Sequence, residues 1–498
     1  MGASVVSALA LIPFGYIVLV TVSTGLATIV PFIARPRVAD LLINTVALLA
    51  LAVPLTTILG VTSAWLVERT SIPARRILAI LLAAPLVIPA FVTSYGWVTV
   101  RPSLAGLPAG VLIASLAYYP LIYLPVAATL RRLDPGLEEV AASLGRGPWS
   151  VFRRVVLPQL RLPILGGGLL VGLHLLAEYG AFAMVRFETF TTAIVQLYNS
   201  TYSGPGAASL AGVLVVLCLL LLVMESAARG RTRFARIGSG SARRPMRVEL
   251  GRWRWPAAIT LAGLVVLAVG VPMSSVVRWL VRGGVEVWTE AHILPALAQS
   301  LAYGLAGAAI AVLLAAPIAV LAVRYPSGFS RLLEGADYVA SSLPAIVVAL
   351  ALGTLTLRVV PPLYQTVATL ILAYVLLFLP RALINLRSGI AQVPVGLEEV
   401  ARSLGSTPTR AFLRVTARMA TPAALAGGAL VFLGVVNELT ATLLLGPNGT
   451  RTLPIQFWTH VNDLDYAQAA PYALLMVVLS VPMVFVLFRA ANVRIAHG

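Results

Sequence analysis

The chain has 498 residues, of which 59% are hydrophobic and only 11% are charged. Soluble proteins carry about 25% charged residues, so this composition excludes a soluble enzyme and predicts a chain whose main solvent is the lipid bilayer. The net charge of +18 does not indicate a nucleic-acid partner, because the arginines lie in short loops between apolar blocks, where they report orientation in a membrane.

The apolar blocks are about twenty residues long, the length of helix that crosses a hydrocarbon core of roughly 30 Å. They predict an all-α polytopic membrane protein with twelve spans. In chain order the expected spans cover residues 5–31, 41–67, 77–100, 108–130, 163–185, 207–228, 256–278, 296–323, 336–358, 363–384, 422–446 and 469–489. The first block lacks a basic leading segment and is long for a signal peptide, so we interpret it as a retained span.

A polar stretch at residues 229–254, rich in Gly, Ser and Arg, separates the sixth span from the seventh. Its composition is typical of a flexible linker. It divides the chain into a first six-helix repeat, residues 1–228, and a second, residues 255–498. An N-terminus in the cytoplasm places this linker and the other arginine-rich loops inside, as the positive-inside rule requires. We therefore expect both termini to be cytoplasmic.

Internal similarity supports two repeated halves. The segment GLEEVAASLG at residues 136–145 recurs as GLEEVARSLG at residues 396–405, an offset of 260 residues. The same offset pairs Pro148 with Pro408, Phe152 with Phe412, Arg154 with Arg414, Glu178 with Glu438 and Gln196 with Gln456. Halves with six spans each have the same orientation, as parallel repeats require. The prediction is a pseudo-twofold pair fused in one chain, with its axis along the membrane normal.

The repeated segment has the pattern of a short helix-turn-helix on the cytoplasmic surface. Leu137, Val140 and Leu144 fall on one helical face. Gly145 is a natural C-terminal stop, and Pro148 suits the first turn of a new helix. The second half repeats the pattern with Leu397, Val400, Leu404, Gly405 and Pro408.

A single loop of this kind could be an amphipathic connector lying on lipid headgroups. Two copies, each just before the fifth span of its half, weaken that interpretation. Both copies also carry paired acids, Glu138–Glu139 and Glu398–Glu399, which anionic lipid would repel. Two acidic protrusions with apolar faces better suit a soluble partner of twofold symmetry.

These residues resemble the permeases of binding-protein-dependent ABC importers. The family's cytoplasmic signature is Glu-Ala-Ala, three residues, Gly, nine residues, Ile, one residue, Leu-Pro. The first copy matches its spacing at Glu139, Ala141, Gly145, Val155, Leu157 and Pro158, with Val140 in place of the first alanine and Val155 in place of the isoleucine. The second matches at Glu399, Ala401, Gly405 and Val415 but ends Ala417–Arg418 instead of Leu-Pro. The signature therefore does not predict where the second loop ends. The resemblance covers essentially the whole chain and implies the type I importer permease fold in a bacterial inner membrane.

The resemblance also implies partners. In the family, this loop docks into a groove on the ATPase, so we expect two copies of a cytoplasmic ATPase and one extracytoplasmic binding protein. The expected coupling residues are Glu138, Glu139, Ala141, Gly145, Glu398, Glu399, Ala401 and Gly405. The chain contains no lysine and therefore no Gly-x-x-x-x-Gly-Lys-[Ser/Thr] loop. We expect no catalytic residue and no cofactor here, with ATP and Mg²⁺ on the partner.

Two acids mark a candidate translocation path. Glu178 and Glu438 lie within the fifth and eleventh expected spans at the same repeat position. An acid at membrane depth is costly and favours a functional interpretation. Tyr179 and Asn437 are neighbours that could line the same cavity. The alternative, that each acid accepts hydrogen bonds only to hold helices together, stays open.

The external loops offer residues for docking a binding protein: Glu188 and Gln196 in the first half, and His460 and Asp463 in the second. Some are metal-ligand types, but we favour a solvated loop and expect no stable metal site in this chain. The single cysteine, Cys218, lies in an apolar block without a thiol partner, which predicts plain helix packing.

The sequence predicts the substrate less directly than it predicts the fold. The stretch LAEYGAFAMVRFETFTTAIVQLY, which contains Glu178, most resembles the ferric-iron permeases, and two path acids suit a trivalent cation. Thiamine or another small solute is the alternative. An ion-coupled secondary transporter would have no use for doubled coupling loops. A membrane-embedded enzyme would need clustered His, Asp or Glu, and the four histidines are not grouped.

Overall fold

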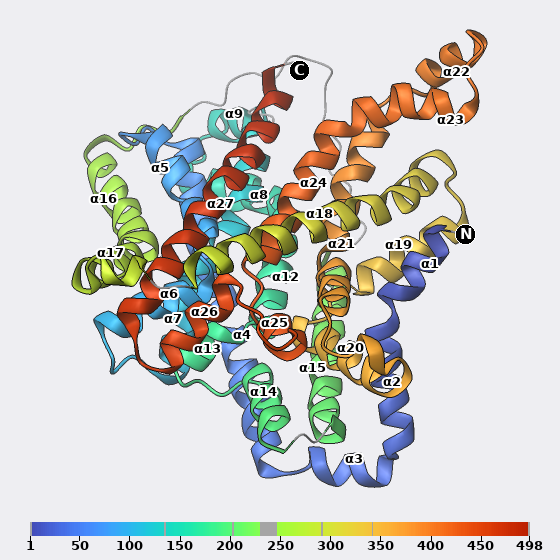
Figure 1. The fold of residues 1–498 in the computed structure, drawn as a ribbon. Coiled ribbons are helices and arrows are strands. Elements are labelled where there is room, and N and C mark those ends of the chain that lie inside the picture. The colour runs from blue at the N-terminus through green and yellow to red at the C-terminus, as the bar shows by residue number, and fades with distance from the viewer. Residues whose placement is uncertain are drawn as a thin grey trace. The chain divides into compact units, whose positions relative to one another are not determined.

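The computed structural model describes residues 2–133, 136–201, 204–229, 247–289, 292–340 and 342–496. Most of the expected linker, residues 230–246, lies outside them. The described chain divides into two compact units, and Figure 1 labels most of the α-helices of both. One unit holds residues 36–193 and 216–278, and the other holds residues 1–35, 194–215 and 279–498.

The first of these units is built on the first half of the sequence. It contains α4 (Pro36–Arg69), α5 (Arg75–Leu81), η1 (Ala84–Val87), α6 (Ala90–Val100), α7 (Gly106–Tyr118), α8 (Pro120–Arg132), α9 (Gly136–Ser143), α10 (Pro148–Val151), η2 (Phe152–Val156), α11 (Leu157–Gln159), α12 (Arg161–Ala177), α13 (Gly180–Met184), η3 (Gly251–Trp253), α16 (Arg254–Val265) and η4 (Val266–Gly270). Three helices, α14 (Phe190–Thr201), α15 (Gly204–Arg229) and α17 (Val271–Gly283), have residues in both units.

The other unit is built on the second half and also takes in the N-terminus. It contains α1 (Gly2–Ala10), α2 (Ile12–Thr24), α3 (Leu26–Ile33), η5 (Glu286–Trp288), α18 (Ile293–Arg324), α19 (Gly328–Ala340), α20 (Ala345–Val359), η6 (Pro361–Leu363), α21 (Val367–Ala391), α22 (Val395–Ser403), α23 (Pro408–Ala411), η7 (Phe412–Ala417), α24 (Arg418–Val436), α25 (Thr440–Leu445), α26 (Leu453–Asn462) and α27 (Tyr466–Ala496).

The helices are long and apolar enough to cross a membrane. Seven described helices qualify alone, and eleven spans result if each of four bent helix pairs is counted as one. A further apolar stretch, Tyr466–Pro482, begins α27. Large apolar side chains point outward along these helices, among them Ile43 and Leu313, which are 65% and 70% exposed. Outward apolar faces of this extent suit contact with lipid. The all-α polytopic architecture is confirmed.

Several spans expected to be unbroken are bent instead. Between α1 and α2 the chain turns by 46°, and in the third and ninth expected spans the two helices of each pair meet at 95° and 102°. In both of the latter, a proline, Pro89 or Pro344, directly precedes the second helix with extended backbone. Proline suits a helix start and favours extended backbone before it, so each proline restarts a helix in a new direction.

Each unit includes helices from the other half of the sequence. In the unit containing α4, Gly96 of α6 lies against Pro272 of α17, so close that a methyl group at residue 96 would overlap the proline backbone. In the unit containing α18, the Tyr16 hydroxyl of α2 lies 3.0 Å from the Thr354 hydroxyl of α20. The Ser7 hydroxyl of α1 donates to Asp337 of α19 at 3.4 Å.

Candidate functional site

The first repeated loop folds as a helix, a tight turn and a second helix. At the end of α9 the Arg146 amide donates to the Ala141 carbonyl at 3.2 Å, while the Gly145 amide donates to the Ala142 carbonyl at 2.9 Å. Gly145 has a φ of +78°, the left-handed conformation that closes a helix and favours glycine. Pro148 then begins α10.

The second loop has the same turn. The Ser406 amide donates to the Ala401 carbonyl at 3.1 Å, and Gly405 has a φ of +86°. The Thr407 hydroxyl accepts from the Arg410 amide and caps the start of α23. Two copies of one local sequence therefore form one local structure, as the repeat predicts.

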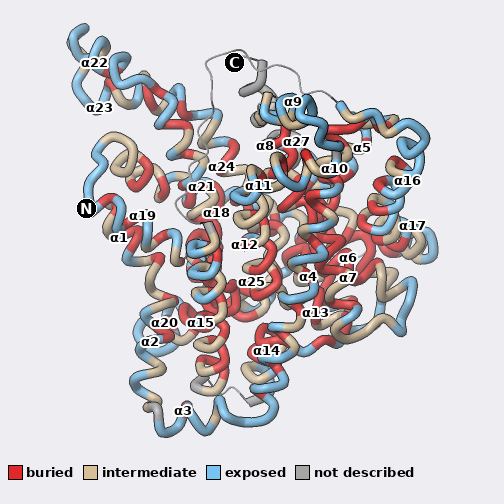
Figure 2. The backbone as a smooth tube through the Cα atoms, turned by 180° about the vertical axis from the view of Figure 1, so that it is seen from behind, coloured by how far each residue is buried: buried red, intermediate tan, exposed pale blue. Residues whose placement is uncertain are grey.

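Both loops leave an apolar face uncovered. Val140 and Leu144 of the first are 59% and 76% exposed, and Val400 and Leu404 of the second are 56% and 80% exposed. Figure 2 shows α22 and α23 largely in the pale blue of exposed residues. Ala141 and Ala401 are half-buried, close to this face. Exposed apolar patches on a polar loop are typical of surfaces that bind another protein.

In each acidic pair, the first glutamate contacts an arginine and the second is exposed to solvent. Glu138 Oε1 lies 2.9 Å from Arg69 Nη2, and Glu398 Oε1 lies 3.0 Å from Arg324 Nη2. Burial raises the pKa of the Glu138 carboxyl, while the Arg69 guanidinium acts in the opposite direction. By contrast, Glu139 and Glu399 are exposed.

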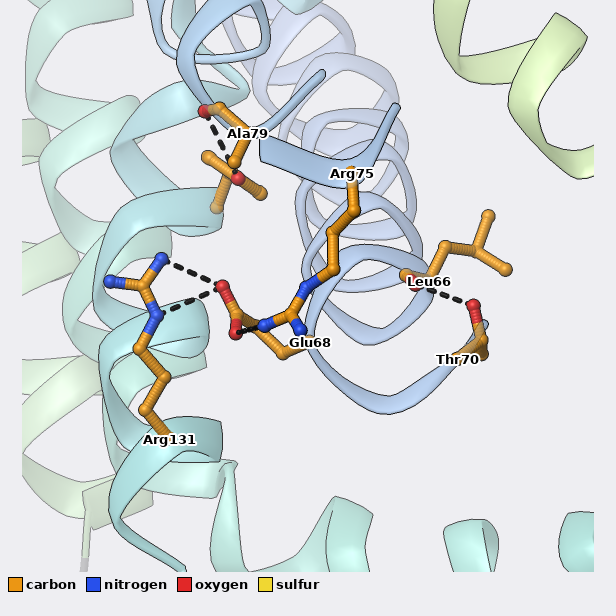
Figure 3. Close-up of polar contacts among 7 residues, drawn as sticks. Leu66, Glu68, Thr70, Arg75, Ala79 and Arg131 are labelled. Atoms are coloured by element: carbon orange, nitrogen blue, oxygen red, sulfur yellow. Dashed lines mark hydrogen bonds and ion pairs between the residues drawn. The ribbon is translucent and has the colours of Figure 1, made fainter. Parts of the chain in front are cut away.

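A buried acid next to Arg69 completes an ion cluster that we did not anticipate from the sequence. Glu68, with only 3% of its side chain exposed, accepts from Arg75 at 2.9 Å through one carboxylate oxygen. Its other oxygen accepts from Arg131 Nη2 at 2.7 Å and Nε at 2.9 Å. Figure 3 shows Glu68 between the two arginines. The cluster joins the end of α4 to α5 and α8.

The two loops differ where they lead into the membrane. Each passes through one turn of π-helix, η2 or η7. After the Leu157–Pro158 pair the first loop bends by 66° into α12, whereas the second, with Ala417–Arg418 there, runs unbroken from Pro408 to Val436. Proline removes an amide donor and disrupts a helix interior. The departure from the family signature thus coincides with a straight helix, which contains Pro422, and the glycine turn at Gly405 is unchanged.

The fifth and eleventh expected spans break at the candidate path acids. α12 ends at Ala177, and Glu178 is extended, with φ −74° and ψ 123°. α24 ends at Val436, two residues before Glu438. The expectation of continuous helices over 163–185 and 422–446 is therefore wrong at these points. Broken helices at membrane depth are typical of substrate paths in transporters.

Both acids bond to the short helix that follows the break. Glu178 Oε1 accepts from the Ala181 amide at 2.9 Å, and Glu438 Oε1 accepts from the Ala441 amide at 3.0 Å. The backbone carbonyls of Glu178 and Glu438 accept from the hydroxyls of Thr191 and Thr442, respectively, at 2.7 and 2.8 Å. Backbone groups freed by a break in a membrane need such partners.

The surroundings of the two acids otherwise differ. The Tyr118 hydroxyl donates to Glu178 Oε2 at 2.6 Å. Glu438 instead interacts electrostatically with Arg381, whose guanidinium lies 4.7 Å from the Phe378 ring centre.

The two neighbours of the acids are placed differently. Tyr179 is half-buried. Asn437 donates from Nδ2 to the Leu433 carbonyl at 3.0 Å and to the Ser480 hydroxyl at 3.2 Å. These contacts use the Asn437 amide group to join α24 and α27.

The four candidate docking residues are more scattered. Glu188 pairs with Arg37 at 3.5 Å, with both side chains more than half exposed, and Gln196 is exposed on α14. His460 stacks on Tyr472 at 5.5 Å, and Asp463 is exposed at the end of α26. Among the described residues, no group of three or more His, Cys, Asp or Glu is placed to hold a metal ion. Cys218 is buried.

Comparison with known proteins identifies the family to which this chain is similar. The family model for the inner membrane component of binding-protein-dependent transport systems matches twice, at residues 20–233 and 307–493. The chain is 35% identical over 483 residues to the Fe(3+)-transport system permease protein FbpB 2 of Haemophilus influenzae, covering 96% of each chain.

More distant relatives align with only part of the chain. The sulfate transport system permease protein CysW of Escherichia coli K12 is 26% identical over 43% of this chain and 81% of its own. The putative 2-aminoethylphosphonate transport system permease protein PhnU of Salmonella typhimurium is 34% identical over 25% of this chain and 43% of its own. With two matched domains and a relative aligned along nearly its whole length, this chain belongs to the family of binding-protein-dependent ABC transport permeases, as a fused two-domain member.

Proposed function

We propose that this chain forms the whole translocation pore of an ATP-driven importer and carries ferric iron delivered by an extracytoplasmic binding protein. The observation that carries the proposal is the doubled loop: each copy combines a glycine turn with positive φ, an exposed acid and an exposed apolar face. The iron assignment draws on the relative named as an Fe(3+) permease, which is aligned over 96% of this chain.

The proposed assembly follows from the repeat. Residues 1–228 and 255–498 are the two six-helix repeats, joined by residues 229–254, and both termini lie in the cytoplasm with the loops. Each loop then binds one copy of the same ATPase, because the exposed residues Glu139 with Leu144 and Glu399 with Leu404 present like surfaces. Glu188, Gln196, His460 and Asp463 belong to the opposite side and contact the binding protein.

The proposed path passes the two broken helices, with Glu178, Tyr179, Asn437 and Glu438 beside it. Carboxylate oxygens are preferred ligands of hard, highly charged cations. Sulfate is an anion, and a carboxylate beside the path would repel it. The acids therefore favour ferric iron over the substrate named for the sulfate permease relative.

Uptake by the purified system tests the substrate. We expect proteoliposomes containing the permease and its ATPase, with the loaded binding protein outside, to accumulate radioactive ferric iron only when ATP is enclosed. An ATPase variant that binds but cannot hydrolyse ATP serves as the control. ATP-dependent uptake of thiamine or sulfate, without uptake of iron, would overturn the iron assignment and leave the importer assignment standing.

A further inference from the structure

An arginine at the end of a long helix holds the first acid of each doubled pair. Arg69 is the last residue of α4 and pairs with Glu138, and Arg324 is the last residue of α18 and pairs with Glu398. The side chains of the two arginines are only 2% and 11% exposed. Both halves thus place the same ionic contact between a membrane-spanning helix and the loop.

In the second half Arg324 contacts three parts of the loop. Arg324 Nη2 donates to the Val393 carbonyl, just before α22, at 3.2 Å and to the Thr416 hydroxyl of η7 at 3.5 Å. The Thr416 hydroxyl in turn donates to the Glu398 carboxylate. The entry to the loop, its first helix and its exit therefore meet at one guanidinium.

In the first half Glu138 is the main acidic partner of Arg69, because the other nearby acid, Glu68, is bound to two other arginines. The neighbouring Glu68 also interacts with Arg69, but its two carboxylate oxygens already accept from Arg75 and Arg131. A buried guanidinium needs a compensating charge, and removing one partner of such a pair is strongly unfavourable. Glu138 supplies that charge from α9, so α9 is held to the end of α4.

We propose that Arg69 and Arg324 are positioning residues for energy coupling. They hold Glu138 and Glu398 and transmit movement of each loop to α4 and α18, while Glu139 and Glu399 stay free to face the ATPase. The inference rests on the proposed function and gives the two acids of each pair different partners. Without the ionic contact, the loop can move with the ATPase while α4 and α18 do not move.

Neutral variants test this role without leaving a buried charge. In the quadruple variant Arg69→Met/Glu138→Gln/Arg324→Met/Glu398→Gln, side chains of similar size replace both pairs, and such replacements are often neutral for stability. We expect ATPase binding to persist and iron transported per ATP hydrolysed to fall at least about fivefold, the lower end of typical coupling between sites. Stimulation of ATP hydrolysis by the loaded binding protein should fall in parallel.

Two matched variants separate positioning from general damage. Arg75→Gln also removes an arginine–glutamate contact of 2.9 Å near the end of α4 but leaves Glu68 bound to Arg131 and touches neither loop. It should keep the wild-type ratio of transport to hydrolysis. The conservative double variant Arg69→Lys/Arg324→Lys, which keeps both charges, should retain most of the coupling.

A folded quadruple variant with the wild-type ratio would overturn the proposal. Loss of ATPase binding in that variant would overturn it as well, since the pairs would then belong to the docking surface. Absence of ATP-driven uptake in the wild-type protein would contradict the proposed function instead. Even without measurable uptake, normal stimulation of ATP hydrolysis in the quadruple variant would overturn the positioning role. Failure of the proposed function and failure of the positioning role are therefore distinguishable.

Discussion

Valine at both turn glycines, in the double variant Gly145→Val/Gly405→Val, is expected to abolish ATP-driven transport while the protein still inserts in the membrane. Both glycines have positive φ, and a Cβ at either would meet no atom within 4 Å. The effect therefore comes from the backbone, because a left-handed conformation costs an L-residue roughly 1–2 kcal/mol and is a marked outlier for a β-branched one. Each coupling turn should open, and both docking surfaces should lose their shape.

The chain supplies its own control for this experiment. Gly147 and Gly396 lie in the same two loops, have open space around the position of a Cβ, and do not have positive φ. The double variant Gly147→Val/Gly396→Val should therefore keep most ATPase binding and transport. Transport and ATPase co-purification would be measured at matched expression. Equal losses in the two double variants would show that bulk in the loop, and not the left-handed turn, is responsible.

Replacing both path acids is expected to have the second large effect. In Glu178→Gln/Glu438→Gln the amide oxygens can still accept from the Ala181 and Ala441 amides, so the helix breaks should persist. The negative charges disappear, however, and with them the attraction of the two carboxylates for a cation. At Glu438 the change also removes the acid that interacts with Arg381. We expect ferric uptake per assembled complex to fall by at least about tenfold. The single variant Glu178→Gln leaves the interaction of Glu438 with Arg381 in place, so it should assemble and bind the ATPase normally.

Leucine at the same positions distinguishes path from packing. Leucine cannot accept the contacts at 2.9 and 3.0 Å that start α13 and α25, and loss of a comparable cap costs about 0.5–2 kcal/mol each. We expect Glu178→Leu/Glu438→Leu to lower the thermal midpoint further than the glutamine pair does. The exposed Glu249, changed to glutamine, controls for loss of a carboxylate elsewhere. Full uptake in the double glutamine variant would leave both acids as packing elements.

Hydropathy predicted the spans but could not predict their breaks. The helices after Glu178 and Glu438 have only five and six residues, so an average over about nineteen residues does not register them. Glutamate itself was the available signal, because an acid within an apolar block needs a local partner. The right-angle turns at Pro89 and Pro344 were marked by proline, yet proline alone does not fix the new direction.

The pairing of the acids also depended on tertiary structure. Neighbouring residues on a helix point about 100° apart, so Glu138 and Glu139 could not both face the same surface. Which one faces inward is decided by Arg69, which is far away in sequence but in contact in the fold. An arginine just after the second expected span of each half, Arg69 and Arg324, was a readable signal, although the two lie 255 residues apart and not 260.

Membership of the two units was the least predictable feature. The sequence repeat assigns α2 to the first half and α17 to the second. In the structure Tyr16 of α2 contacts Thr354, and Pro272 of α17 contacts Gly96. Composition cannot reveal such exchanges, because apolar helices that face lipid on one side and protein on the other have similar residues.

The mass of the intact complex tests the central claim most directly. The claim is that this single chain presents two equivalent docking surfaces, one built on Gly145 and the other on Gly405. Permease and ATPase would be co-expressed, purified in mild detergent and weighed as an intact assembly by native mass spectrometry. We predict one permease of 52.4 kDa with two ATPase subunits, and loss of both in Gly145→Val/Gly405→Val. A wild-type complex containing one permease and one ATPase would contradict the account.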